Sequence, residues 1–305
     1  MNITRKNYLE LVLFTRRRRK INMKVYISVD MEGIGGVVSL SHVLSGSKEY
    51  ERFRKWLTEE VLAVIEGARE AGATKITVAD SHGGMTNILI EDLPENVEVV
   101  SGFPRPICMM HGIWEGYDTA FFIGYHARKG TRGAIMDHTI AGRIFRYIKI
   151  NQKETSEFYL NALLAGFYNI PVSLLSGDAA ICREAKTAIP GIEVVITKQG
   201  ITRWSAKTKT LKSIKRELKE AAIRAIKKVR ERKIKPLRIE DNIILELGFY
   251  STDTADIVEM IPGAERVDGL TVVFKTKNIL EAYKLIELAM IIGIGIDSLV
   301  QKMMK

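Results

Sequence analysis

The sequence is short of cysteine, of internal repeats and of long apolar runs, and each shortage excludes a class of protein. Its 305 residues include two cysteines, Cys108 and Cys182. Two cysteines without a CxxC pair do not make a disulfide framework or a zinc finger, and a reducing cytoplasm is the expected compartment. The longest mainly apolar run, around 285–296, contains Glu287 and is too short to span a bilayer, so we expect no membrane partner. No segment recurs at the spacing typical of repeat proteins.

Positive charge is concentrated at the start of the chain. The formal net charge is +10, and residues 1–22 contain seven basic residues and one acidic residue, so six of the ten charges fall there. This segment does not fit a signal peptide, because its apolar stretch is too short and its arginines follow that stretch. It is either a disordered basic arm for nucleic acid or membrane, or an extension that is not native. We favour the second interpretation, because Met23 leads directly into the first predicted strand.

Apolar strand-like segments alternate with amphipathic helices in residues 23–189. Buried strands are predicted at 24–29, 75–79, 119–125 and 171–176, and helices at 48–71 and 155–168. Alternating strands and helices indicate an α/β fold with a mainly parallel sheet. The strands are continuously apolar, which indicates that helices cover both faces of the sheet. Residues 143–150 are predicted to add a strand, as part of a hairpin.

Residues 190–305 are predicted to form a second, smaller α+β lobe. They begin with a basic stretch, 198–238, that contains sixteen Lys or Arg and three Glu. An apolar stripe predicts a helix within it, and the basic face of this helix is expected to be solvated. A nucleic-acid partner is not expected, because no aromatic residues are interleaved with the charges. This helix is predicted at 209–233. Strands at 243–249 and 270–275 and a final helix from 279 to about 290 complete the lobe.

Polar side chains follow the first three predicted strands at the point where each strand ends. Asp30 and Glu32 follow the first strand, His82 the second, and His126 the third. Ligands of open parallel sheets bind outside the carboxyl ends of the strands, so we expect these side chains to form one site. Imidazole together with carboxylate suits zinc, manganese or cobalt, whereas magnesium prefers oxygen ligands alone. The carboxylates suffice for two metals bridged by Asp30.

Other interpretations of these residues remain open at this point. A magnesium-dependent phosphatase with Asp30 as nucleophile and Glu32 as its partner fits the DxE pattern, although such sites contain few histidines. A non-enzymatic nucleic-acid binder would use the basic arm and the basic helix. His42 and His111 lie away from the strand ends and are expected to be structural. Asp178, after the fourth strand, is expected to cap the following helix.

With these residues in place, the sequence resembles the zinc-dependent D-aminopeptidases encoded in bacterial dipeptide-transport operons. The resemblance covers residues 23–290 and rests on these motifs: SVDMEG (28–33), DSHG (80–83), GYHAR (124–128), ETSEFYLNALLAG (154–166), MIPG (260–263) and LEAY (280–283). It implies two zinc ions per chain, with Asp30 as the bridging ligand. The other implied ligands are Glu32, His82, His126 and Glu157. Glu157 alone resembles an ordinary acid in the first turn of a helix.

The resemblance also implies an activity and an assembly. A hydroxide bridging two zinc ions would attack the peptide bond after the first residue of a short peptide, in particular a D-amino-acid peptide. His138 matches a family histidine with a catalytic role, and it is expected to act as general acid and base or to stabilise the oxyanion. The expected partners are short peptide substrates and further copies of the chain, in a ring of two stacked pentamers.

Overall fold

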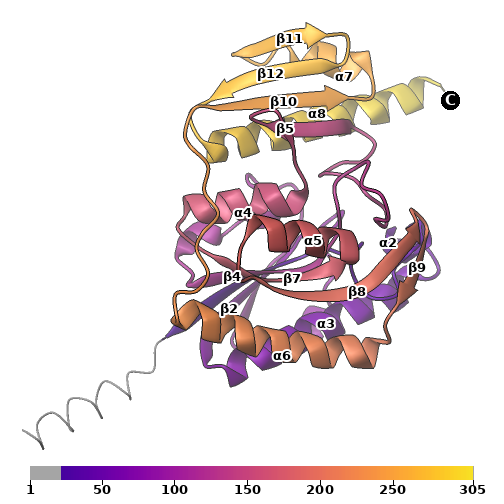
Figure 1. The fold of residues 1–305 in the computed structure, drawn as a ribbon. Coiled ribbons are helices and arrows are strands. Elements are labelled where there is room, and N and C mark those ends of the chain that lie inside the picture. Colours follow the sequence, from indigo (N-terminus) through magenta and orange to yellow (C-terminus); the bar gives the residue numbers. More distant parts are fainter. Residues whose placement is uncertain (1–21, 305) are drawn as a thin grey trace, which may run out of the picture.

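The computed structural model describes residues 22–304, so the predicted basic extension lies outside the described residues except for its last residue. A seven-stranded sheet forms the centre of the molecule (Figure 1). Neighbouring strands are parallel from β3 to β8, and β9 is antiparallel to β8. In spatial order the strands are β3 (Val97–Val100), β2 (Ala73–Asp80), β1 (Met23–Val29), β4 (Thr119–Tyr125), β7 (Val172–Asp178), β8 (Glu193–Thr202) and β9 (Ser205–Thr208).

Helices cover both faces of this sheet, as the continuously apolar strands indicate. On one face α3 (Tyr50–Glu70) and α6 (Leu211–Arg230) pack against each other, and on the other lie α4 (Glu157–Phe167) and α5 (Ala179–Ala188). Successive residues of a strand point to opposite faces, so Val25 and Ile27 enter the core beneath α3 and α6, whereas Tyr26 enters the core on the α4 side. A short helix, α2 (Leu40–Val43), precedes α3.

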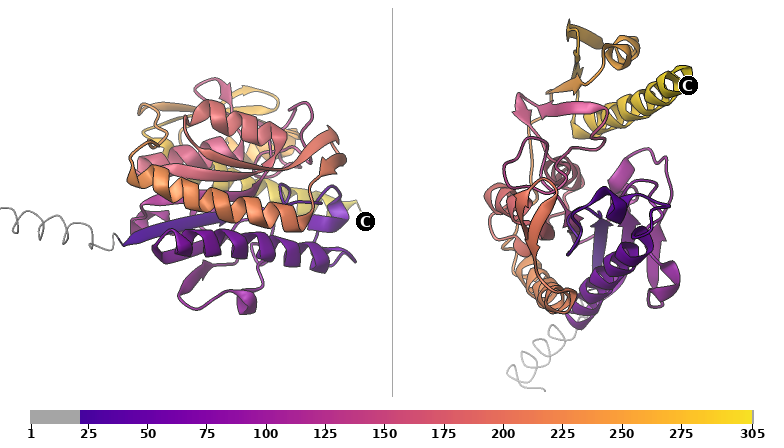
Figure 2. Two further views of the ribbon diagram at one scale, coloured as in Figure 1. Left: turned by 60° about the horizontal axis from the view of Figure 1, so that its bottom comes forward. Right: turned by 90° about the vertical axis from the view of Figure 1, so that its right-hand side faces the viewer.

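A second, five-stranded antiparallel sheet lies at one end of the molecule (Figure 2). Its order is β11 (Ala264–Asp268), β12 (Thr271–Thr276), β10 (Ile243–Phe249), β5 (Phe145–Ile150) and β6 (Lys153–Glu154). The long helix α8 (Ile279–Met303) packs against β10, β12, α4 and the short helix α7 (Thr252–Val258). Buried hydrogen bonds join α8 to the large sheet: Tyr283 donates to Asn161 at 2.7 Å, and Asn161 donates to Tyr125 at 2.8 Å.

The predicted fold class is confirmed, and several elements differ from the prediction. Strands β3, β8, β9 and β11 and helices α2 and α7 were not predicted. Helix α8 continues to Met303, beyond the predicted end near residue 290. Gly293 lets the helix pack closely on Ile144, because a Cβ at this position would lie 2.4 Å from the Ile144 side chain. No helix among residues 22–304 has the length and apolarity needed to cross a bilayer.

Sheet membership does not follow the predicted boundary at residue 190. Strands β8 and β9 and helix α6 come after this boundary, yet they belong to the large sheet and its covering layer. Strands β5 and β6 come before it, yet they pair with β10 in the small sheet. The division of the chain into domains at residues 23–189 and 190–305 therefore stays a prediction.

Candidate metal centre

The candidate site lies where the strand order of the large sheet reverses. From β1 the chain continues to β2 and β3 on one side, and it returns to form β4 on the other side. Such a switch point opens a crevice at the carboxyl ends of the strands. Asp30 directly follows β1, and His126 directly follows β4, so the two side chains come from the strands that flank the switch point. His82 lies two residues beyond the end of β2.

Two glycines allow the segments after β1 and β4 to approach closely. A Cβ on Gly33 would lie 2.0 Å from the carbonyl oxygen of Tyr125, and a Cβ on Gly124 would lie 2.1 Å from that of Asp30. Gly124 also has a φ of +73°, which side-chain-bearing residues rarely adopt. The Gly33 N–H donates to the Gly124 carbonyl at 2.7 Å. The absence of side chains at these positions thus lets Asp30 and His126 lie side by side.

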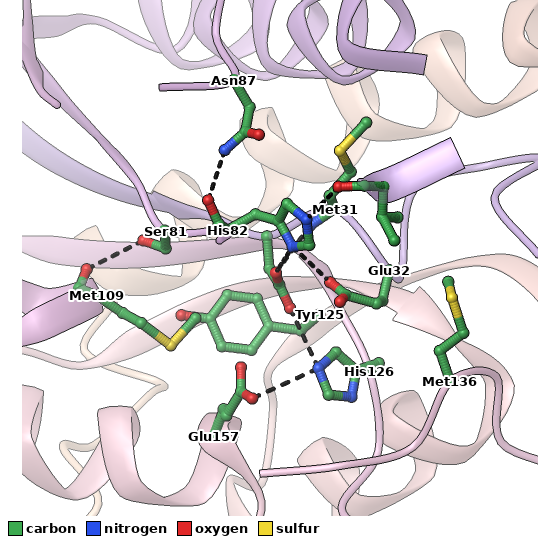
Figure 3. A network of polar contacts seen from close by, with 12 residues as sticks. Met31, Glu32, Ser81, His82, Asn87, Met109, Tyr125, His126, Met136 and Glu157 are labelled. Atoms are coloured by element: carbon green, nitrogen blue, oxygen red, sulfur yellow. Dashed lines mark hydrogen bonds and ion pairs between the residues drawn. The ribbon is translucent and has the colours of Figure 1, made fainter. Parts of the chain in front are cut away.

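Asp30, Glu32 and His82 form a first group, in which one potential ligand atom of each residue lies within 4.8 Å of the others. His82 Nδ1 is 2.9 Å from Glu32 Oε2 (Figure 3) and 3.4 Å from Asp30 Oδ1. All three side chains are largely buried. Three such ligands could hold a divalent cation and leave a coordination position open.

Asp30, His126 and Glu157 form a second group within the same distance limit. His126 Nε2 lies 3.5 Å from Glu157 Oε1 (Figure 3) and 3.4 Å from Asp30 Oδ2. Glu157 is the first residue of α4, and its Oε1 also accepts the backbone N–H of Ile140 at 2.7 Å. Asp30 belongs to both groups, one oxygen facing each histidine, so the geometry suits two cations that share this carboxylate.

Backbone carbonyls orient the histidine rings. His82 Nε2 lies 2.9 Å from the carbonyl oxygen of Val43, and His126 Nδ1 lies 3.0 Å from that of Ala127. A ring nitrogen that faces a carbonyl oxygen must carry the hydrogen, so in a neutral ring the other nitrogen has a lone pair available to a metal ion that lies between it and the carboxylates. An N–H held in this way is the usual support of a metal-binding histidine.

Two atoms at the centre of the site have no hydrogen-bond partner among residues 22–304. They are Asp30 Oδ2 and His126 Nε2, which are buried and face each other. Burial and the neighbouring carboxylate of Glu32 raise the pKa of Asp30 to about 8. Burial alone would lower the pKa of His82, but Glu32 and Asp30 raise it well above its usual value. Carboxylates brought together in a buried site favour an accompanying positive charge, and the donor set fits a divalent metal of the zinc type.

His138 lies beside the second group. Its ring stacks on that of His126 with centroids 4.2 Å apart, and its Nε2 is 3.8 Å from Glu157 Oε1. Its Nδ1 lies 2.8 Å from the carbonyl oxygen of Met136. Burial and the neighbouring His126 lower the pKa of His138. A neutral imidazole at this position can accept a proton, but Glu32, His126 and His138 also form a third possible ligand group.

Asp178 and His42 have structural roles. The Asp178 carboxylate accepts the N–H groups of Ala180 and Ile181, so the predicted helix cap is confirmed. His42 stacks on Phe53 with ring centroids 3.9 Å apart.

Asp80 supports the loop that carries His82. Its carboxylate accepts the side-chain amide of Asn87 at 2.7 Å and the Ile88 N–H at 2.8 Å. The Asn87 amide in turn donates to the His82 carbonyl at 2.7 Å (Figure 3).

Lys198 supports the other side of the site, and sequence reasoning missed it. It lies in β8, is 1% exposed, and donates to the carbonyl oxygens of Glu32, Ile34 (2.8 Å) and Val37 (2.5 Å). Burial lowers its pKa to about 8. In the sequence Lys198 begins a run of surface lysines and arginines, so nothing distinguishes it from them. Its ammonium group gives the Glu32 and Val37 carbonyls a donor in the tight turn after Asp30, and it adds to the Val37 N–H that the Ile34 carbonyl already accepts.

Comparison with known proteins gives consistent matches over nearly all of the chain. The model of the D-aminopeptidase family, peptidase family M55, matches residues 23–288. The D-aminopeptidase of Bacillus subtilis (strain 168) is 37% identical over 263 residues, which are 86% of this chain and 94% of that protein. The structure of the Zn-dependent D-aminopeptidase DppA from Bacillus subtilis, a self-compartmentalizing protease, superposes with a TM-score of 0.85 at 35% identity. This match covers 89% of the present chain and 98% of DppA.

Proposed function

Because the chain belongs to the D-aminopeptidase family, peptidase family M55, we propose that it removes N-terminal D-amino acids from short peptides with two bound zinc ions. The observation that carries the zinc proposal is the pair of ligand groups that share Asp30. Glu32 and His82 would complete one zinc site, and His126 and Glu157 the other. Three carboxylates against two divalent ions leave a positive charge of about one, which favours the negative charge that develops on a peptide carbonyl oxygen.

The chain's own residues would hold the substrate and move the proton. Zinc, when bound, lowers the pKa of a water toward ~7 and polarises the scissile carbonyl. His138 would accept the proton of the attacking water at Nε2 and return it to the leaving amine. The Met136 carbonyl holds the ring for this task by accepting the Nδ1–H. The free amino group of the substrate would lie at the metal centre in its neutral form, because the zinc-loaded site carries a positive charge.

The phosphatase alternative is less consistent with these contacts. Each oxygen of Asp30 faces a histidine, Oδ1 facing His82 and Oδ2 facing His126. A magnesium-dependent phosphatase site contains few histidines. The imidazole groups also favour zinc over magnesium.

We further propose that the chain assembles into a closed homo-oligomer that encloses its active sites, in the manner of two stacked pentamers. The support is the self-compartmentalizing DppA structure and the exposed apolar side chains of α8. These are Leu288, Ile291, Ile294, Leu299, Val300 and Met303. Light scattering should give a mass near ten chains, and a monomer at micromolar concentration would refute this assembly.

Metal analysis combined with a peptide screen tests the proposed function. The purified chain should bind about two zinc ions and hydrolyse short D-peptides, and a chelator should abolish turnover. L-peptides of the same sequence are the matched control and should be cleaved poorly. Retention of magnesium alone, with turnover of a phosphate ester but of no peptide, would refute the proposal. Parallel assays with cobalt and manganese would show which metals support turnover.

A further inference from the structure

Two pockets meet at the candidate metal centre. The smaller has a volume of about 390 Å³ and the larger about 790 Å³. Glu32, His82 and His138 line both, together with Gly83 and Gly84. A peptide whose scissile bond lies at this centre would therefore extend into one pocket on each side.

The two pockets differ in charge. The smaller is lined by apolar side chains such as Phe103 and Met290, and its charged groups are the candidate ligands Asp30, Glu32 and Glu157. The larger pocket is lined by three basic residues, Lys129, Arg143 and Arg203. Among residues 22–304, Glu32 is the only acidic residue that lines it. An anionic group is thus attracted to the larger pocket, where the basic side chains lie.

The basic residues of the larger pocket differ in their partners. Arg203 donates from Nε to Asp137 Oδ1 at 2.7 Å, which fixes its guanidinium group, and Arg143 pairs with Asp297 at 3.0 Å. The Lys129 ammonium lies 4.3 Å from the centre of the Tyr250 ring. Within residues 22–304 it has no carboxylate partner and no hydrogen-bond acceptor. Lys129 therefore carries a positive charge that is available to a ligand.

We propose that the larger pocket binds the free C-terminal carboxylate of a short peptide, with Lys129 as its main partner and Arg203 as a second. This inference rests on the proposed function, because the scissile bond must lie at the metal centre. The leaving part of a dipeptide or tripeptide ends in a carboxylate only a few residues away, at about 3.3–3.6 Å per residue. Removing that carboxylate from water is unfavourable unless a charged donor replaces the water. Lys129 and Arg203 are specificity-determining residues in this assignment.

The test compares a short D-peptide with its C-terminal amide. The wild-type chain, loaded with zinc, should cleave the free acid with a kcat/KM at least ~10-fold above that of the amide, mainly through a lower KM. Lys129→Met should reduce this preference by lowering kcat/KM for the acid more than kcat/KM for the amide, and Lys129→Arg should restore most of the preference. Lys275→Met is the matched control, because Lys275 is exposed on β12 and does not line the pocket.

The outcomes separate this inference from the proposed function. Equal kcat/KM for acid and amide in the wild-type chain would overturn the carboxylate assignment and leave the peptidase function standing. A preference for the acid that Lys129→Met does not reduce would overturn the role of Lys129. No cleavage of either peptide by the zinc-loaded chain would overturn both proposals. Zinc content and circular dichroism of each variant would show that the site and the fold are intact.

Discussion

The Nε2 atom of His126 and the Oδ2 atom of Asp30 face each other across 3.4 Å, and neither has a hydrogen-bond partner among residues 22–304. Buried polar atoms are normally paired, so this pair marks a position that favours a cation. The two residues follow the strands that flank the switch point of the large sheet. The fold thus brings together two side chains that are 96 positions apart in the sequence.

The first prediction concerns zinc stoichiometry. Asp30→Asn should reduce bound zinc from about two ions per chain to nearly none, because Asp30 belongs to both ligand groups. Glu157→Gln should leave about one, because Glu157 belongs to one of the two. Both variants should lose at least ~100-fold in activity, since even residues that only support a metal ligand contribute 10–100-fold. Native mass spectrometry of the wild-type chain and of each variant measures the zinc stoichiometry. Equal zinc loss in the two variants would contradict an Asp30 that is shared by both sites.

The second prediction separates the two possible roles of His138. If it transfers protons, His138→Gln should retain two zinc ions and lose ~10²–10⁴-fold in kcat. If it is a ligand, within the group of Glu32, His126 and His138, the variant should lose zinc as well. His111→Gln is a matched control outside the site and should change neither quantity. We expect full zinc content with low kcat, and loss of zinc would assign His138 to the metal.

The sequence predicts the part of the site that comes from strand ends. Asp30, His82 and His126 each follow an apolar run, and the carboxyl ends of parallel strands share one edge of a sheet. Their proximity therefore follows from the fold class alone. Glu157 lies at the start of α4, and in the sequence it looks like any acid that favours a helix N-terminus. Only the resemblance to a family indicates it.

The supports of the site are harder to predict, because their sequence signals are weak or absent. The groups that orient the rings of His82, His126 and His138 are backbone carbonyls, which every residue has. Lys198 is buried by the arrangement of β8 against the turn after Asp30, and this arrangement depends on strand order. The pairing of β5 with β10 joins segments about 100 residues apart. Such contacts are set by tertiary structure and leave no local periodicity.

The third prediction tests the support of the His82 loop. Asn87→Ala removes the amide that donates both to Asp80 and to the His82 carbonyl. Zinc affinity, measured by competition with a chelator, should fall ~10–100-fold, and stability should fall by about 1–3 kcal/mol. Tyr50→Phe is the matched control, because it removes only the bond from the Tyr50 hydroxyl to Asn87. Unchanged zinc affinity in Asn87→Ala would show that the loop does not need this support.

The fourth prediction concerns Glu60, a buried carboxyl on α3 that accepts the Gly35 N–H at 2.9 Å. Burial raises the pKa of Glu60 to about 7, from 4.5 in an exposed chain. Between pH 4.5 and pH 7 the unfolded chain therefore releases this proton while the folded chain keeps it. The contribution of Glu60 to the free energy of unfolding falls as the pH rises through this window, and it stays low above pH 7.

Glu60→Gln keeps a hydrogen-bond acceptor and removes this titration. The variant should match the wild-type chain near pH 4.5 and should exceed its free energy of unfolding by up to about 3 kcal/mol at pH 8, at 1.36 kcal/mol per pKa unit. Urea denaturation of the metal-free proteins at both pH values measures the difference, because the titrations of the metal ligands then cancel between variant and parent. Glu66→Gln, at an exposed position of the same helix, should show no such dependence. A stabilisation by Glu60→Gln that is equal at both pH values would show that the gain does not come from the buried charge.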